Sequence, residues 1–123
     1  MSKRQFRSKF EARTAADLKK RKVEFEYESV RIKYHLSLDC TYTPDFKLGN
    51  GIVVETKGRF VAADRRKHLA IRAQRPELDI RFVFMRNNTL SKVSKTKYSD
   101  WCDKNNFKWA IGSVPEEWVN EST

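Results

Sequence analysis

TYTPDFKLGNGIVVETK, residues 41–57, is the stretch of sequence that decides the fold. Two strand-like runs flank the Gly49–Gly51 segment, and this pattern predicts a β-hairpin. A three-residue loop would place Asp45 directly opposite Glu55 on one face of the hairpin. A two-residue turn would instead place Asp45 opposite Thr56, on the other face. We expect the three-residue loop, because a glycine readily takes the left-handed conformation that such loops use.

Asp45, Glu55 and Lys57 form a PD…ExK pattern, which is typical of a large nuclease superfamily. In a strand, Glu55 and Lys57 project from one face. Two carboxylates can hold Mg²⁺, which polarises a phosphate and activates water. A nearby lysine can orient or deprotonate that water, or stabilise developing charge. An exposed Asp, Glu and Lys are also ordinary cross-strand charge pairs, so the motif alone leaves both interpretations open.

The charge of the chain favours a polyanionic partner. Its 26 Lys and Arg residues outnumber 16 Asp and Glu residues, for a formal net charge of +10. DNA or RNA is the natural partner for such a protein, and a generic solubilising surface is the alternative. Arg65, His68, Arg72 and Arg75 recur at helical spacing and share one helix face. That face either binds phosphates, together with Arg59, or is simply solvated.

Several classes of protein are disfavoured. No apolar run approaches the roughly 20 residues that cross a bilayer, and residues 1–22 are basic without the apolar core of a signal peptide. We therefore expect a protein of the cytoplasm with no membrane partner and no small-molecule cofactor. Cys40 and Cys102 form no CxxC pattern, and His35 and His68 lack zinc-ligand spacing, so neither a disulfide framework nor a zinc site is expected.

The remaining patterns predict a mixed α/β domain with a central sheet. Glu11 follows Ser8 at the spacing of a capping box, so its simplest role is to cap a helix, and its alternative role is to bind a second metal ion. The tryptophans are expected to pack in the core. The expected elements are helix 8–22, strand 23–36 with a bulge or bend near 28–29, connector 37–40, helix 64–75, strand 78–85, helix 98–104 and a short turn from 115.

Over nearly its whole length the sequence resembles the phage endonuclease I family of junction-resolving enzymes. The segments that carry the resemblance are FRSKFE (6–11), VEFEYE (23–28), TYTPDF (41–46), NGIVVETKG (50–58), DRRKHLAIRAQRPELDIRFVF (64–84) and VPEEW (114–118). The resemblance implies an Mg²⁺-dependent endodeoxyribonuclease, with Mn²⁺ as a substitute, that resolves four-way (Holliday) junctions and cleaves branched DNA. It also implies a role in phage DNA processing and host DNA degradation, in the host cell cytoplasm.

The resemblance assigns roles to individual residues. It makes Glu11, Asp45, Glu55 and Lys57 catalytic, which reverses the preference for Glu11 as a mere cap. It makes the carboxylates of Asp45, Glu55 and Glu11, with the backbone carbonyl of Thr56, ligands to one or two metal ions. The residues that we expect to contact DNA are Arg7, Lys9, Arg59, Arg65, Lys67, His68 and Arg72.

The resemblance also implies a restriction-endonuclease-like α/β fold, a mixed sheet flanked by helices, in an intertwined homodimer. Residues 1–123 would form one nuclease domain. Residues 1–36 would be exchanged between protomers, 37–41 would be the bridge, and 42–123 would be the core with the catalytic hairpin. Two alternatives stay open, a less structure-selective DNA nuclease and a catalytically inactive DNA-binding module.

Overall fold

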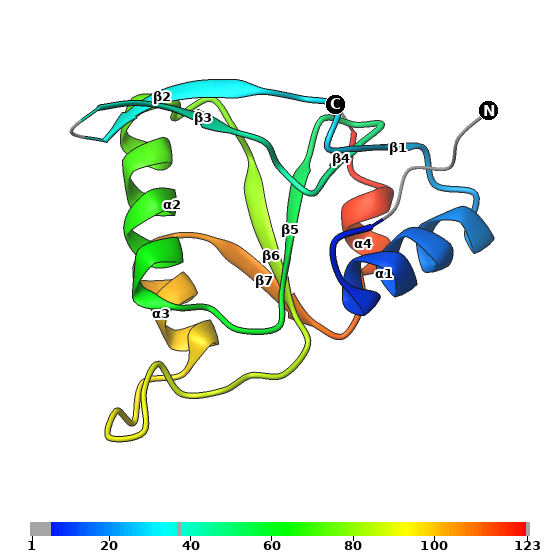
Figure 1. Ribbon diagram of the computed structural model, residues 1–123. Helices are drawn as coiled ribbons and strands as arrows, with labels where there is room; N and C mark the ends of the chain where they lie inside the picture. The colour runs from blue at the N-terminus through cyan, green and yellow to red at the C-terminus, as the bar shows by residue number, and fades with distance from the viewer. Residues whose placement is uncertain (1–5, 37, 123) are drawn as a thin grey trace.

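The computed structural model describes residues 6–36 and 38–122, which form a mixed five-stranded sheet with helices on both faces (Figure 1). The strand order is β1-β4-β5-β6-β7, and β2 and β3 form a separate two-stranded sheet. The elements are α1 Lys9–Lys20, β1 Phe25–Tyr27, β2 Ile32–Leu36, β3 Leu38–Tyr42, β4 Phe46–Leu48, β5 Val53–Lys57, α2 Ala62–Gln74, β6 Ile80–Phe84, α3 Tyr98–Lys104, β7 Lys108–Ile111 and α4 Glu116–Val119. The predicted α/β class, with a mixed sheet flanked by helices, is confirmed.

The β4–β5 hairpin has the predicted register. Phe46 pairs with Val54 in antiparallel fashion, and the Leu48 amide donates to the Ile52 carbonyl at 2.8 Å. This pairing leaves a three-residue loop, in which Gly51 has φ of +91°. A glycine takes this left-handed conformation without the steric penalty of a Cβ. The loop therefore fixes which residues of β4 and β5 face each other.

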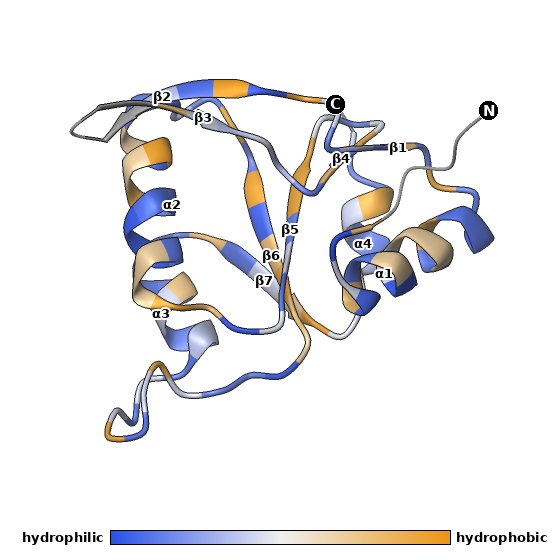
Figure 2. Cartoon of the chain, viewed as in Figure 1, coloured by the Kyte–Doolittle hydropathy of each residue, from blue (hydrophilic) through white to orange (hydrophobic). Residues whose placement is uncertain are grey.

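The two faces of the sheet bury separate apolar clusters. Strand side chains alternate between faces, so Val54 and Val83 pack with α1 and α4, whereas Phe82 and Phe84 pack with α2 and α3. All five residues of β6 are buried, because parallel strands on both sides and helices on both faces cover it. Figure 2 shows this hydrophobic character along β5 and β6, between the helices.

The first helix begins as predicted and ends two residues early. The Ser8 hydroxyl accepts the Glu11 amide proton at 3.0 Å, as an N-cap does. The Glu11 carboxylate reaches back to the Arg7 amide, at 3.3 Å, one residue beyond the usual partner in a capping box. The helix stops at Lys20, and the chain turns at Lys22, which has a positive φ of 58°.

The predicted strand 23–36 is two strands in different sheets. The chain bends at Glu28, whose φ is +48°, which confirms the bend, rather than the bulge, of the two possibilities that the change in alternation left open. The predicted connector 37–40 is wrong for residues 38–40, since they belong to β3, and Tyr34 of β2 pairs with Cys40. Residue 37 lies outside the described residues. Pairing with β2 gives hydrogen-bond partners to backbone N–H and C=O groups that would have none in an unpaired connector.

Later elements follow the prediction with smaller differences. α3 has the predicted bounds, β6 lies within the predicted 78–85, and α4 follows Pro115. α2 starts at Ala62, two residues before the predicted start, so Asp64 lies in its first turn, where its carboxylate accepts the Val61 amide proton at 3.3 Å. The prediction missed β7, a short edge strand with little apolar alternation. Among the described residues, no helix is long and apolar enough to cross a membrane.

Candidate active site

A cavity of about 410 Å³ beside β5 brings all four predicted catalytic residues together. Asp45 precedes β4, Glu55 and Lys57 extend from β5, and Glu11 comes from the first turn of α1. Glu28, at the bend after β1, also lines this cavity. The start of α1, the bend after β1 and the β4–β5 hairpin therefore supply four carboxylates and Lys57 to a single site.

Glu55 is the most firmly held of these groups. It is 3% exposed, and its Oε2 accepts the Tyr42 hydroxyl at 2.8 Å and the Asp45 amide at 3.0 Å. Its Oε1 lies 3.5 Å from the Lys57 Nζ and 3.8 Å from the His68 Nε2. Because a buried tyrosine and a backbone amide fix one oxygen, the other oxygen is directed toward the lysine.

Asp45 lies in an unfavourable electrostatic environment. Its Oδ2 accepts the Thr56 amide at 2.9 Å and the Thr56 hydroxyl at 3.0 Å. Burial and the neighbouring carboxylates of Glu55 and Glu11 nevertheless raise the pKa of Asp45 to about 8. The metal-free site thus holds more negative charge than Lys57 can compensate, which is the condition that a bound cation relieves.

Glu11 occupies a defined position across from Asp45. The Tyr27 hydroxyl donates a hydrogen bond to Glu11 Oε1, and the same hydroxyl accepts the Arg7 amide at 3.1 Å. Burial and the Glu11 carboxylate raise the pKa of the Tyr27 phenol above its ordinary value, so it stays a donor. Glu11 is therefore tied to the start of α1 and also lines the cavity, a position that is compatible with both roles considered from the sequence.

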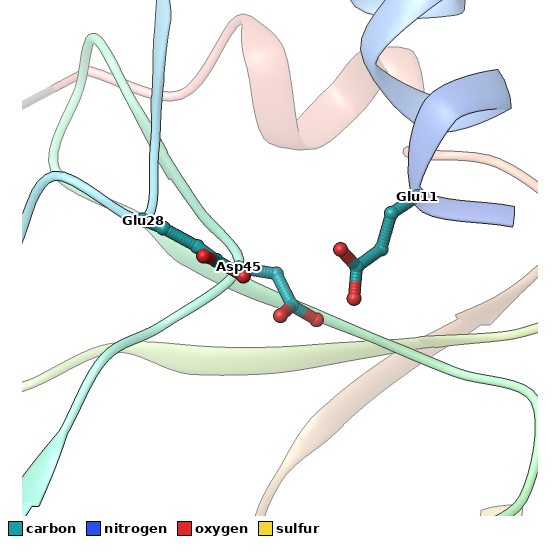
Figure 3. A group of neighbouring side chains, drawn as sticks. All are labelled: Glu11, Glu28 and Asp45. Carbon is teal, nitrogen blue, oxygen red and sulfur yellow. The ribbon is translucent and has the colours of Figure 1, made fainter. Parts of the chain in front are cut away.

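Glu28 is a site residue that the sequence reasoning missed. Single oxygens of Glu11, Glu28 and Asp45 lie within 4.8 Å of one another, and Figure 3 shows the three side chains converging from separate segments. Glu28 also pairs with the Arg7 Nε at 3.0 Å, and its amide donates to the Asp45 carbonyl at 3.2 Å. The available signal was the change in strand alternation at residues 28–29, which marks the bend that turns Glu28 inward.

The predicted DNA contacts fall into two groups. Arg7 and Lys67 line the cavity, and Lys9 and Arg59 are exposed. These four positions are compatible with contacts to DNA. The Lys67 ammonium also lies 5.3 Å from the centre of the Tyr42 ring, so its stem packs beside the residue that holds Glu55.

The other predicted contacts on α2 are directed toward the protein. His68 is fully buried, and neither ring nitrogen has a hydrogen-bond partner among the described residues, so the prediction that it contacts DNA is wrong for this structure. Arg72 stacks 3.9 Å from the centre of the Phe107 ring, and Arg65 donates to the Phe60 carbonyl at 2.6 Å. Within the shared helix face, His68 therefore packs on the sheet, whereas Arg65 and Arg72 are partly exposed and bond to neighbouring loops. Helical spacing groups residues without showing which way they point.

Comparison with known proteins places the chain in a family. The family model for phage endonuclease I matches residues 1–123. The chain belongs to the phage endonuclease I family. Endonuclease I of Escherichia phage T7 is 47% identical over 118 residues, covering 94% of this chain and 79% of that protein. Endodeoxyribonuclease 1 of Enterobacteria phage T3 is 45% identical over 120 residues, covering 96% of this chain and 79% of that protein. The resemblance to the phage endonuclease I family is thus confirmed.

The raised pKa of Asp45 gives a test of the site's electrostatics. A folded-state pKa above the unfolded value means that the folded protein binds the proton more tightly, so the free energy of unfolding falls as pH rises from about 4 to about 8. Asp45→Asn removes this penalty. In metal-free buffer we expect the variant to exceed wild type in unfolding free energy by about 5 kcal/mol at pH 8, with little difference near pH 4. Urea denaturation at both pH values measures this.

Glu117→Gln, on the exposed surface of α4, is the matched control and should leave the free energy of unfolding nearly unchanged at both pH values. If Asp45→Asn raised the free energy of unfolding equally at pH 4 and pH 8, ionisation of Asp45 could not be the cause of the lower stability of wild type.

Proposed function

We propose that this protein is a divalent-metal-dependent endodeoxyribonuclease that hydrolyses phosphodiester bonds. The observation that carries the proposal is the convergence of Asp45, Glu55 and Lys57 in one cavity, with Glu11 and Glu28 opposite them. The net charge of +10 fits a nucleic-acid substrate. The names of the T7 and T3 relatives, an endonuclease and an endodeoxyribonuclease, support DNA as the substrate.

The donor set fits Mg²⁺, with Mn²⁺ as a substitute, at one or two ions per site. The site offers only oxygen ligands, which hard cations prefer, and the raised pKa of Asp45 marks an excess of negative charge. The Asp45 and Glu55 carboxylates with the Thr56 carbonyl would hold one ion. Glu11 and Glu28, with Asp45 shared, would hold a second. A bound ion would supply charge neutralisation to the phosphoryl group and lower the pKa of water.

Lys57 acts as a cation in this proposal. Burial alone would lower the pKa of its ammonium, but the surrounding carboxylates, of which Glu55 has the largest effect, outweigh burial and raise that pKa. A protonated lysine can stabilise negative charge that develops on the phosphate or on the leaving oxygen. This state favours charge stabilisation over removal of a proton from water, the two roles that the sequence left open.

Arg7 and Lys67 bring positive charge to the cavity that holds the carboxylates, and Lys9 and Arg59 are exposed on the segments that carry Glu11 and Lys57. Arg7 keeps 77% of its side chain exposed while pairing with Glu28, so it can also reach a phosphate at the rim of the cavity. Such contacts position the DNA backbone without reading sequence. The basic side chains would attract a phosphodiester electrostatically and position it next to the carboxylates that bind the metal ion.

We further propose that the preferred substrate is branched DNA, above all the four-way junction, and that the protein acts as an intertwined homodimer. Two cuts in two strands require two active sites, which a two-fold dimer supplies. β2 and β3 pair with each other outside the five-stranded sheet, so the segment before β3 is joined to the rest of the chain through this small sheet. Separation of β2 from β3 would let residues 1–36 exchange between copies and bring Glu11 to the other chain's Asp45.

Sedimentation equilibrium at micromolar concentration tests the assembly independently of cleavage. The proposal predicts a dimer of the 14.6 kDa chain. A species that stays monomeric at these concentrations would exclude the exchange and leave the cavity described above as a complete site within one chain.

Cleavage of a labelled four-way junction beside its linear duplex, with Mg²⁺ and with EDTA, tests the function. We expect Mg²⁺-dependent cutting that favours the junction. Lys57→Ala should lower the cleavage rate by about 100-fold or more, because it removes a charge that is most effective in the transition state. Its dissociation constant for the junction should stay within about threefold of wild type, since Lys57 is one cation among many.

Lys104→Ala, at an exposed position in α3, is the matched control and should cut at the wild-type rate. Equal cutting of junction and duplex would keep the nuclease and exclude the junction preference. Tight binding without any cutting would favour the inactive DNA-binding module.

A further inference from the structure

Residues 86–99 form a basic surface to which the cleavage chemistry assigns no role. No acidic residue occurs between Asp79 and Asp100. Arg81 is buried in this stretch and pairs with Asp79. The exposed cations that remain are Arg86, Lys92, Lys95 and Lys97. Four exposed positive charges therefore lie on one short excursion between β6 and α3.

This excursion is an ordered finger, which we define as residues 89–97. Its two sides meet at an antiparallel bridge between Thr89 and Lys97, and the Leu90 amide donates to the Thr96 carbonyl at 2.8 Å. Within the turn, the Ser94 amide donates to the Ser91 hydroxyl at 3.2 Å. A finger held by its own hydrogen bonds loses little conformational entropy when it binds a partner.

The base of the finger is tied to α3. The Asn87 amide group and Ser99 exchange two hydrogen bonds, at 2.7 and 3.0 Å, and the Tyr98 amide donates to the Asn88 carbonyl at 2.8 Å. Tyr98 itself is buried against the sheet. The finger therefore projects from a fixed base rather than from a free loop, as Figure 1 shows for the yellow segment below α3.

The tip of the finger carries an exposed apolar side chain. Val93 is 93% exposed, whereas no other large hydrophobic residue in the described part of the chain exceeds 43%. Lys92 and Lys95 are both exposed beside it. A single exposed valine needs no explanation by itself. An apolar tip between two cations, however, matches the edge of a DNA groove, where phosphates flank the apolar faces of the sugars.

The finger starts beside the catalytic strand. The Met85 amide donates to the Lys57 carbonyl at 3.0 Å, so the chain leaves β6 next to the lysine of the active site. The parallel strands β5 and β6 end together at this edge of the sheet. DNA that places a phosphodiester in the cavity would continue past this edge, within reach of a segment that projects from it.

We propose that the finger is a second DNA-contacting element, in which Lys92 and Lys95 bind phosphates of the duplex arm next to the cleaved strand. Val93 then packs against sugars at the edge of the minor groove. The identity of the partner as DNA rests on the proposed function. The finger adds affinity and orientation, and it takes no part in the chemical step.

Three variants test the finger by DNA binding in EDTA, where no cleavage occurs, between about 50 and 200 mM salt. Each phosphate contact contributes about 0.9 to the slope of log affinity against log salt, so Lys92→Ala with Lys95→Ala should lower that slope by about 1.8. Val93→Ser should weaken binding about three- to tenfold with the slope unchanged, because an apolar contact releases no counterion. Lys19→Ala with Lys20→Ala, at the far end of α1, is the control with the same change in charge and should lower the slope by less than half as much.

A second readout separates the finger from the active site. Single-turnover cleavage with Mg²⁺ at saturating protein should stay within about twofold of wild type in both finger variants, since saturation compensates for weaker binding. The proposal is overturned if the finger variants bind like wild type, or if the α1 control loses as much of the salt slope. If wild type still cuts DNA in that case, the proposed function stands and only the finger is wrong. A wild-type protein that neither binds nor cuts DNA would overturn both.

Discussion

The backbone register between β4 and β5 is the constraint on which the active site depends. The three-residue loop, with Gly51 in the left-handed conformation, pairs Phe46 with Val54 and sets Asp45 beside Glu55. A slip of one residue would turn every side chain of β4 to the opposite face. Phe46 would leave the core, and Asp45 would lose its position against Glu55. Folding and chemistry thus favour the same register, since the pairing that buries Phe46 also assembles the carboxylates.

The carboxylates of the active site repel one another, so the rest of the fold must stabilise their arrangement. Glu55 is buried, where a tyrosine hydroxyl, a backbone amide and a nearby lysine stabilise it, and Asp45 has a raised pKa. Burial and the positive charge of Lys57 lower the pKa of His68, so this buried imidazole adds no compensating charge. The apolar clusters on both faces of the sheet supply the stability that offsets this local strain. Repulsion between the carboxylates lowers the stability of the folded protein, and a bound cation would relieve this repulsion. Such a loss of stability at a functional site is a common compromise between stability and activity.

The sequence predicted the parts of this architecture that depend on local pattern. The loop length and the alternation of the strands predicted the hairpin register correctly. The apolar run before Met85 predicted the position of β6. Helical spacing grouped His68 with the arginines of α2 but could not show that the His68 side chain is buried. Glu28 was missed because its place depends on a positive φ and on the pairing of Tyr27 with Phe46, residues far apart in the chain. β7 was missed because a short edge strand has little apolar alternation.

Anomalous diffraction from crystals grown with Mn²⁺ tests the central claim most directly, because it locates the ion without relying on activity. The account predicts an anomalous peak about 2.0–2.3 Å from carboxylate oxygens of both Asp45 and Glu55. A second, weaker peak between Glu11, Glu28 and Asp45 would establish two ions per site. Crystals that bind no Mn²⁺ at Asp45 and Glu55, or that bind it only elsewhere on the protein, would contradict the account.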